Sequence, residues 1–289
     1  MVETSAEAAG HNTFVIGGEL PVNRFGYSTS RLTGRGTWGN PPRPDEAVKL
    51  LRRAVELGVN FFDTAAGYGP GVAERLIRRA LSPYQSDLVI ATKAGMLRPG
   101  PTVWVRDGRP GALRSDVESS LANLNVERLD LLQLHRVDPK VPLADQVGTL
   151  KELQREGKVR FIGLSDVTVG QLQDALQIAN VATVRNRFSL ADRSGWRVLD
   201  FASQRNMGFI AKSPLASGVL ADQRTALARA GRIHGLPPAQ LALAWALRRS
   251  PAVIPTPAPT TIEHLEQNAG AITVRLTDDE LRALHATVL

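Results

Sequence analysis

Four residues that can move protons each lie at the end of a short apolar run or just after one. Asp63 ends Val-Asn-Phe-Phe-Asp, Lys93 ends Leu-Val-Ile-Ala-Thr-Lys, and His135 ends Leu-Asp-Leu-Leu-Gln-Leu-His. Tyr68 lies in the loop that Asp63 begins, Asp-Thr-Ala-Ala-Gly-Tyr-Gly. Taken singly, such residues are more often a helix cap, a solvated amine, a hydrogen-bonded histidine and a packing tyrosine. If the runs are neighbouring parallel strands, the four side chains meet at one edge, where α/β barrels carry their functional groups.

This set of side chains suits the reduction of a carbonyl group, which needs a hydride at carbon and a proton at oxygen. A phenol, with an ordinary pKa of about 10, donates a proton slowly at neutral pH. A cation in contact with it lowers that pKa, and we expect Lys93 to do this for Tyr68. Asp63 is expected to hold Lys93 charged, because an isolated buried ammonium is costly. His135 is expected to hydrogen-bond the carbonyl oxygen.

Apolar or β-branched runs alternate with helical patterns along the chain, which favours a closed (β/α)8 TIM barrel over an open sheet. The predicted strands lie near Arg24–Thr29 and at Val59–Asp63, Asp87–Lys93, Leu129–His135, Phe161–Ser165, Thr183–Asn186, Gly208–Ala211 and Val253–Thr256. The predicted helices are Asp45–Leu57 (with Asp45 at its cap position), Gly71–Leu81, Arg114–Leu124, Leu143–Glu156, Val169–Ala179, Trp196–Gln204 and Ile262–Ala269.

Three segments depart from this alternation. Phe14–Ile16 and Leu20–Asn23 flank Gly17-Gly18, the pattern of an N-terminal β-hairpin that could cover the bottom of the barrel. Between the seventh and eighth strands lie two helical stretches, so one is extra, and a second extra helix begins at Thr277. The three helical segments are Gln223–His234, Pro238–Arg249 and Thr277–Leu289. We expect a flexible tail over residues 1–12 and a single barrel domain over residues 13–289.

Composition excludes several classes of protein. The 289 residues include no cysteine, which excludes a disulfide framework, a thiolate metal site and a cysteine nucleophile. No apolar run reaches the roughly 20 residues that span a bilayer, and the N-terminus lacks the pattern of a signal peptide, so we expect a cytoplasmic protein. The net charge of +7 is spread over amphipathic helices, which argues against nucleic-acid binding. No metal site is expected.

The chain resembles the aldo-keto reductase superfamily over Thr13–Leu289, most closely its bacterial pyridoxal reductase-like members. The resemblance rests on the motif Asp-Thr-Ala-x-x-Tyr-Gly at Asp63–Gly69, on Thr92-Lys93 and Leu134-His135, on the run Gly157–Ser165, and on Ser213-Pro214-Leu215. It implies a catalytic tetrad of Tyr68, Asp63, Lys93 and His135. It also implies NADPH as hydride donor, lying across the barrel mouth without the GxGxxG fingerprint, which the sequence lacks.

Residues expected to contact the cofactor follow from the same resemblance: Ser28, Thr29, Ser165, Asp166, Arg185, Lys212, Ser213, Pro214, Leu215, Ser217, Gly218, Ile254, Thr256, Thr260, His264, Gln267 and Asn268. Some depart from the family's pattern. Asp166 replaces an asparagine and Arg185 a glutamine, so we expect these two opposite charges to form an ion pair. Lys212 stands where an aromatic ring often stacks, and Thr256 and His264 replace the cations that grip the 2′-phosphate of NADPH. NADH is therefore an alternative donor.

The substrate side is expected in the loops beyond the strand ends, 32–42, 98–110, 136–142 and 188–196. Trp38 and Trp104 are candidate pocket walls, and Arg136 could receive an anionic group. We expect a monomer acting on a small-molecule carbonyl substrate, with no membrane partner. Two other functions stay open: an NADP(H)-binding regulatory or partner subunit without catalysis, and an alcohol dehydrogenase running the reverse reaction in a biosynthetic pathway.

Overall fold

A computed structural model describes residues 12–222 and 224–287 of the chain, so residues 1–11 of the expected tail lie outside it. Within these residues, eight parallel strands form one sheet in the order β12-β11-β10-β9-β8-β5-β4-β3. The sheet closes because Gly26 N–H donates to the Pro255 carbonyl at 3.1 Å and Ser28 N–H to the Pro257 carbonyl at 2.9 Å. The strands are β3 (Tyr27–Ser28), β4 (Phe61–Asp63), β5 (Val89–Ala94), β8 (Leu129–Leu134), β9 (Val159–Ser165), β10 (Val181–Arg187), β11 (Gly208–Lys212) and β12 (Val253–Pro255). The predicted TIM barrel is confirmed.

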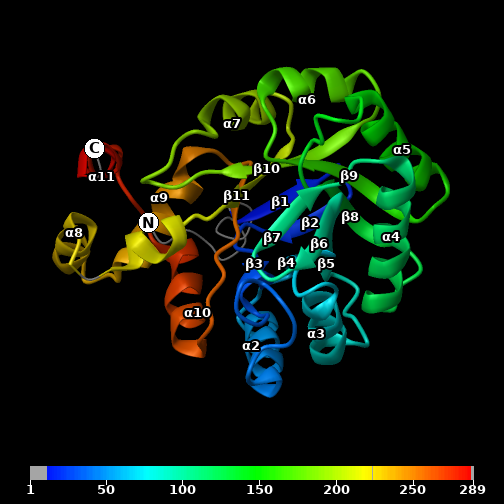
Figure 1. Cartoon of the computed structure of the whole chain (residues 1–289). Coiled ribbons are helices and arrows are strands. Elements are labelled where there is room, and N and C mark those ends of the chain that lie inside the picture. Colours follow the sequence, from blue (N-terminus) through cyan, green and yellow to red (C-terminus); the bar gives the residue numbers. More distant parts are fainter. Residues whose placement is uncertain (1–11, 223, 288–289) are drawn as a thin grey trace.

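Amphipathic helices surround the barrel (Figure 1), each burying its apolar stripe on the strands. They are α2 (Pro44–Glu56), α3 (Val72–Leu81), α4 (Pro110–Leu124), α5 (Leu143–Arg155), α6 (Val169–Leu176), α7 (Trp196–Ser203), α9 (Pro238–Arg249) and α10 (Ile262–Ala269). The prediction that Asp45 caps α2 is wrong. Arg43 occupies the cap position, because Pro44 suits the first helical turn.

The two extra helices are α8 (Ala226–His234) and α11 (Asp278–Thr287), which contact each other outside the ring of helices (Figure 1). In contrast, α9 packs directly on β12 and buries Trp245 completely. Of the two helices between β11 and β12, α9 is therefore the one that belongs to the barrel. The predicted cap of α11 is present: Glu280 N–H donates to Thr277 Oγ1, and Thr277 N–H donates to the Glu280 carboxylate at 2.7 Å.

The N-terminal hairpin, β1 (Thr13–Ile16) and β2 (Leu20–Asn23), is antiparallel and covers one end of the barrel, as predicted. Its alternating apolar residues form one cluster with inward residues of the strands, among them Phe61, Val89 and Leu131. Ile16 and Val22 are fully buried in this cluster. The hairpin therefore closes the barrel at the strand beginnings and leaves the strand ends as the open mouth.

A second hairpin was not predicted. Residues 96–106, most of which were expected to be a loop, form the antiparallel strands β6 (Met96–Gly100) and β7 (Val103–Arg106) directly after β5. Arg98 is buried and binds this hairpin to two other loops, because its guanidinium donates to the carbonyls of Gly67 (2.7 Å) and Thr37 (3.0 Å). The same guanidinium lies 3.7 Å from the ring centre of Trp104. The hairpin thereby holds Trp104 over the barrel mouth.

Candidate active site

The structure brings the four proton-moving residues together at the barrel mouth. Asp63 is the last residue of β4, Lys93 lies near the end of β5, and His135 follows β8 directly. Because β4, β5 and β8 are neighbours in the sheet, these side chains converge, and the loop after β4 places Tyr68 above them. All four residues are buried, Asp63 and Lys93 almost completely.

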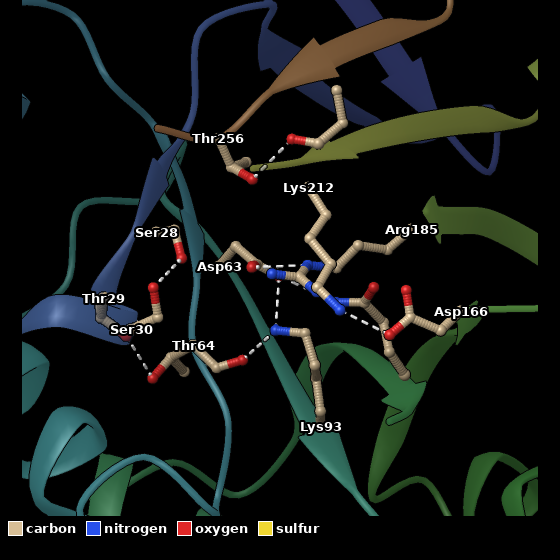
Figure 2. A network of polar contacts seen from close by, with 12 residues as sticks. Ser28, Thr29, Ser30, Asp63, Thr64, Lys93, Asp166, Arg185, Lys212 and Thr256 are labelled. Carbon is tan, nitrogen blue, oxygen red and sulfur yellow. Dashed lines mark hydrogen bonds and ion pairs between the residues drawn. The ribbon is translucent and has the colours of Figure 1, made fainter. Parts of the chain in front are cut away.

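Asp63 lies at the centre of a buried polar network (Figure 2). Its Oδ1 accepts from Lys93 Nζ at 2.7 Å and from Gln133 Nε2 at 3.1 Å, so the expected Asp63–Lys93 ion pair is present. Its Oδ2 accepts from Arg185 Nε at 2.9 Å. Lys93 Nζ also donates to the carbonyl of Thr64. Although burial opposes its ionisation, the two cations hold the pKa of Asp63 below its ordinary value.

The predicted Asp166–Arg185 ion pair is wrong. Asp166 pairs instead with Lys212 at 2.6 Å and with Arg136 at 2.9 Å, while Arg185 pairs with Asp63. Arg185 is level with Ser165 in the register of β10 and β9. Asp166 lies one residue beyond β9 with a left-handed backbone (φ 54°), which directs its side chain to a different set of partners.

Tyr68 lies among aromatic and cationic groups. Its ring meets His135 edge-on at 6.1 Å and Trp104 edge-on at 6.2 Å, and Lys93 Nζ is 5.4 Å from its ring centre. Burial raises the pKa of Tyr68 to about 12, and the positive charge of Arg185 is the largest influence in the opposite direction. From the sequence, this influence was expected of Lys93 instead.

Burial also favours the neutral forms of the two bases next to Tyr68. It lowers the pKa of Lys93 to about 7, with Asp63 opposing the change and Arg185 adding to it. It lowers the pKa of His135 well below the ordinary value, and the neighbouring cations Lys93 and Arg185 act in the same direction. His135 is therefore neutral near pH 7, and its Nδ1 has no hydrogen-bond partner among the described residues. A neutral imidazole can donate a hydrogen bond to an oxygen without carrying charge.

A cavity of about 840 Å³ leads away from Tyr68 and Arg185. Most residues expected to contact the cofactor line it, from β10 and β11 to the segment η2 (Ala216–Ala221) and helix α10. They are Ser28, Arg185, Lys212, Ser213, Pro214, Leu215, Ser217, Gly218, Thr256, Thr260, His264, Gln267 and Asn268. The cavity joins the barrel mouth to α10, and its lining offers the hydrogen-bond donors that a dinucleotide needs.

Four expected contacts lie outside this lining. Ile254 is fully buried in the core below the mouth, and Thr29 donates its hydroxyl to Thr64 Oγ1 at 2.8 Å. Ser165 is buried beside the mouth and its Oγ has no partner among the described residues, while Asp166 makes the ion pairs given above. Ser165 thus keeps a free hydroxyl for a ligand, whereas the side chain of Ile254 serves packing.

Three charged residues of the lining were not expected from the sequence: Arg31, Asp222 and Glu263. Arg31 ends the single turn η1 (Thr29–Arg31) after β3, and Glu263 lies in the first turn of α10. The order of residues gave a signal, because Arg31 closely follows the expected contacts Ser28 and Thr29, and Glu263 precedes His264.

The three predicted substrate residues differ in their surroundings. Trp104 lies against both Tyr68 and His135, 5.7 Å from the latter between ring centres. Trp38 contacts Arg98, with its ring centre 5.7 Å from the guanidinium carbon. Arg136 is partly exposed but bound to Asp166. Trp104 is therefore the one of the three in contact with the catalytic candidates.

Other kinds of site find little support in residues 12–222 and 224–287. No group of three or more histidine, aspartate or glutamate side chains there could hold a metal ion. Among the helices of that part of the chain, none combines the length and the apolar character that crossing a membrane requires.

Comparison with known proteins agrees with this geometry. A profile of the Aldo/keto reductase family matches residues 29–288. An uncharacterized oxidoreductase of Schizosaccharomyces pombe is 42% identical over 91% of this chain and 85% of its own length. Pyridoxine 4-dehydrogenase of Escherichia coli is 35% identical over 94% of this chain and 97% of its own.

Solved structures give the same result. A glycerol dehydrogenase from Gluconobacter oxydans superposes with a TM-score of 0.88 at 26% identity, covering 96% of this chain and 95% of that one. An aldo-keto reductase from Klebsiella pneumoniae, solved in complex with NADPH, superposes with a TM-score of 0.81 at 26% identity and the same coverage.

Proposed function

The chain belongs to the aldo/keto reductase family and is an oxidoreductase, and we propose that it reduces an aldehyde or ketone with NADPH, using Tyr68 as the proton donor. The observation that carries this proposal is the convergence of Tyr68, the buried Asp63–Lys93 pair and a neutral His135 at one end of the 840 Å³ cavity.

NADPH would lie along the cavity and would supply the hydride to the carbonyl carbon. Ser165 and Arg185 fit its amide end, because each keeps a buried polar atom (Oγ and Nη1) without a partner among the described residues. Thr260, His264, Gln267 and Asn268 fit the other end, at helix α10. The Klebsiella pneumoniae neighbour, which holds NADPH, supports this choice.

Proton transfer is the task of the chain's own residues. As the new C–H bond forms, the electron pair of the carbonyl π bond moves to oxygen, and the Tyr68 O–H bond breaks to give the alcohol. The phenolate that remains is stabilised by nearby positive charge. His135, being neutral, is placed to donate a hydrogen bond to the same oxygen and to hold it against Tyr68. Trp104 covers the site and limits access of water.

NADPH differs from NADH by a 2′-phosphate, so the charged residues of the lining favour one nucleotide over the other. Arg31 and His264 offer donors to a 2′-phosphate, whereas the carboxylate of Glu263 repels one. We expect tighter binding of NADPH. NADH binding the same protein more tightly would refute this part of the proposal.

The first experiment is a fluorescence titration with NADPH and NADH side by side, followed by turnover with pyridoxal and a panel of simple aldehydes. Pyridoxal is included because the Escherichia coli relative is named a pyridoxine 4-dehydrogenase. Loss of the reduced-nicotinamide absorbance only when carbonyl is present supports the proposal. Binding of NADPH with no turnover of any carbonyl, and no oxidation of pyridoxine with NADP⁺, would favour a non-catalytic binding subunit instead.

A further inference from the structure

Arg185 is a second buried cation on the carboxylate of Asp63. Arg185 is only 4% exposed. Its Nε donates to Asp63 Oδ2 at 2.9 Å, and its Nη1 has no partner among the described residues. The N–H groups of a buried guanidinium normally donate to carbonyl or carboxylate oxygens. An N–H group without such a partner in a cavity wall can donate to a further acceptor.

The charges around Asp63 do not balance. One carboxylate faces two cations, Lys93 on Oδ1 and Arg185 on Oδ2, so the buried cluster has an excess of one positive charge when both are protonated. The lysine can relieve this excess by releasing its proton, and burial lowers its pKa to about 7. The guanidinium group cannot, because it stays protonated at any pH at which the protein is folded. Arg185 is therefore the permanent charge of the cluster.

Tyr68 is the neighbouring group that can use this charge. Tyr68 and Arg185 both line the cavity, and Figure 2 shows the guanidinium group of Arg185 extending toward Asp63. The other charged groups here are accounted for: Asp166 is paired with Lys212 and Arg136, and Lys93 is bound to Asp63 and the Thr64 carbonyl. His135 is neutral.

We propose that Arg185 supplies the fixed positive charge that stabilises the phenolate form of Tyr68, so that proton donation no longer depends on Lys93 being protonated. Arg185 acts as a positioning residue through Tyr68, and this inference rests on the proposed function only in taking Tyr68 as the acid. It implies that reduction continues at pH values where the lysine has become neutral.

The direct test is the titration of Tyr68 in the protein without cofactor. The chain has three tyrosines, so protein labelled with carbon-13 at tyrosine Cζ gives three resonances, and Tyr68→Phe identifies the one of interest. Wild type is compared with Arg185→Gln, which keeps a hydrogen-bonding side chain without the charge, and with Arg185→Lys, which keeps the charge. Arg114→Gln is the matched control, since Arg114 on the outer helix α4 pairs with Glu152 of α5 and with Glu156 just after that helix.

We expect Arg185→Gln to raise the pKa of Tyr68 by about 1 to 3 units, the effect of removing one adjacent cation. Arg185→Lys should restore at least half of that change, and Arg114→Gln should behave as wild type. Circular dichroism sets the highest pH at which each variant is folded. Equal ionisation of Tyr68 in wild type and Arg185→Gln at that pH, including none in either, overturns the proposal.

A kinetic measurement separates this role from a merely structural one. Oxidation of an alcohol needs the phenolate as base, so with pyridoxine and NADP⁺ as probe the rate of Arg185→Gln should fall by about tenfold or more at neutral pH and recover as pH rises. A uniform loss at all pH values would mean that Arg185 only holds the fold. If Tyr68→Phe keeps full activity, the proposed function fails, whereas the titration of Tyr68 still decides the inference about Arg185.

Discussion

Replacing Asp63 by asparagine tests the buried charge network most severely. The carboxylate is fully buried and forms ion pairs with both Lys93 and Arg185, at 2.7 and 2.9 Å. An asparagine has nearly the same shape but leaves the guanidinium group of Arg185, and the lysine when it is protonated, without a counter-charge. Removal of one partner from a buried ion pair costs about 3 to 5 kcal/mol, which is a large share of the roughly 5 to 15 kcal/mol that stabilises a typical domain.

The cost should depend on pH in a defined direction. Burial lowers the pKa of Lys93 to about 7 in the wild type, even though the charge of Asp63 raises it. Loss of Asp63 must therefore lower this pKa further. Below that value the unfolded chain and the wild type both hold the lysine proton, whereas the folded variant has released it. The unfolding free energy of Asp63→Asn should therefore fall relative to wild type by up to about 1.4 kcal/mol for each unit by which the pH drops.

Urea denaturation at several pH values, followed by circular dichroism, measures both effects. Asp45→Asn is the control, because Asp45 forms an exposed ion pair with Arg79 and exposed pairs contribute little. Adding Lys93→Met to Asp63→Asn should recover part of the lost stability, since no lysine then has to be buried without its carboxylate partner. A loss for Asp63→Asn no larger than that for Asp45→Asn would refute the account of the network.

Three further outcomes are expected. Lys93→Met should abolish a pH dependence of the unfolding free energy. Between the folded pKa of about 7 and the ordinary 10.5, the unfolded wild type binds a proton that the folded wild type lacks, so its unfolding free energy should rise with pH relative to the variant. A difference between the two proteins that stays constant with pH in urea denaturation would contradict this. Trp104→Ala should raise KM by about three- to tenfold with a smaller change in kcat, because an edge-on aromatic contact contributes about 0.5 to 1.5 kcal/mol; an unchanged KM would remove Trp104 from the substrate wall, and Trp104→Phe is the control. Ile16→Ala should lower the unfolding free energy by about 2 to 5 kcal/mol and leave KM unchanged, while Val15→Ala, which is exposed, should do neither; equal stability of the two variants would argue against the hairpin as a plug.

Much of the fold can be predicted from the sequence because most barrel strands are short apolar runs with a polar residue at or next to their last position. The β6–β7 hairpin could not be predicted in this way, since β7 is largely exposed and shows no alternation of apolar and polar residues. What stabilises the hairpin is instead the guanidinium group of Arg98, bonded to carbonyls of distant loops. Such a contact has no local pattern in the sequence.

The candidate site was predictable to a similar depth. Strand ends determine that Asp63, Lys93 and His135 converge, and the loop after β4 brings Tyr68 to them. The partner of Arg185 was not predictable, because pairing depends on which way an inward side chain extends across the barrel. Arg185 and Asp63 are 122 positions apart, and the turn at Asp166 decides that the nearer carboxylate points to Lys212 instead.

Proton donation by Tyr68 is best tested by the kinetics of Tyr68→Phe. The substitution removes one oxygen and keeps the ring that packs on Trp104 and His135. With pyridoxal or another turned-over aldehyde, we expect kcat to fall by about 10² to 10⁴, the usual contribution of a general acid, with the Kd for NADPH unchanged. A kcat equal to that of the wild type would contradict the mechanism.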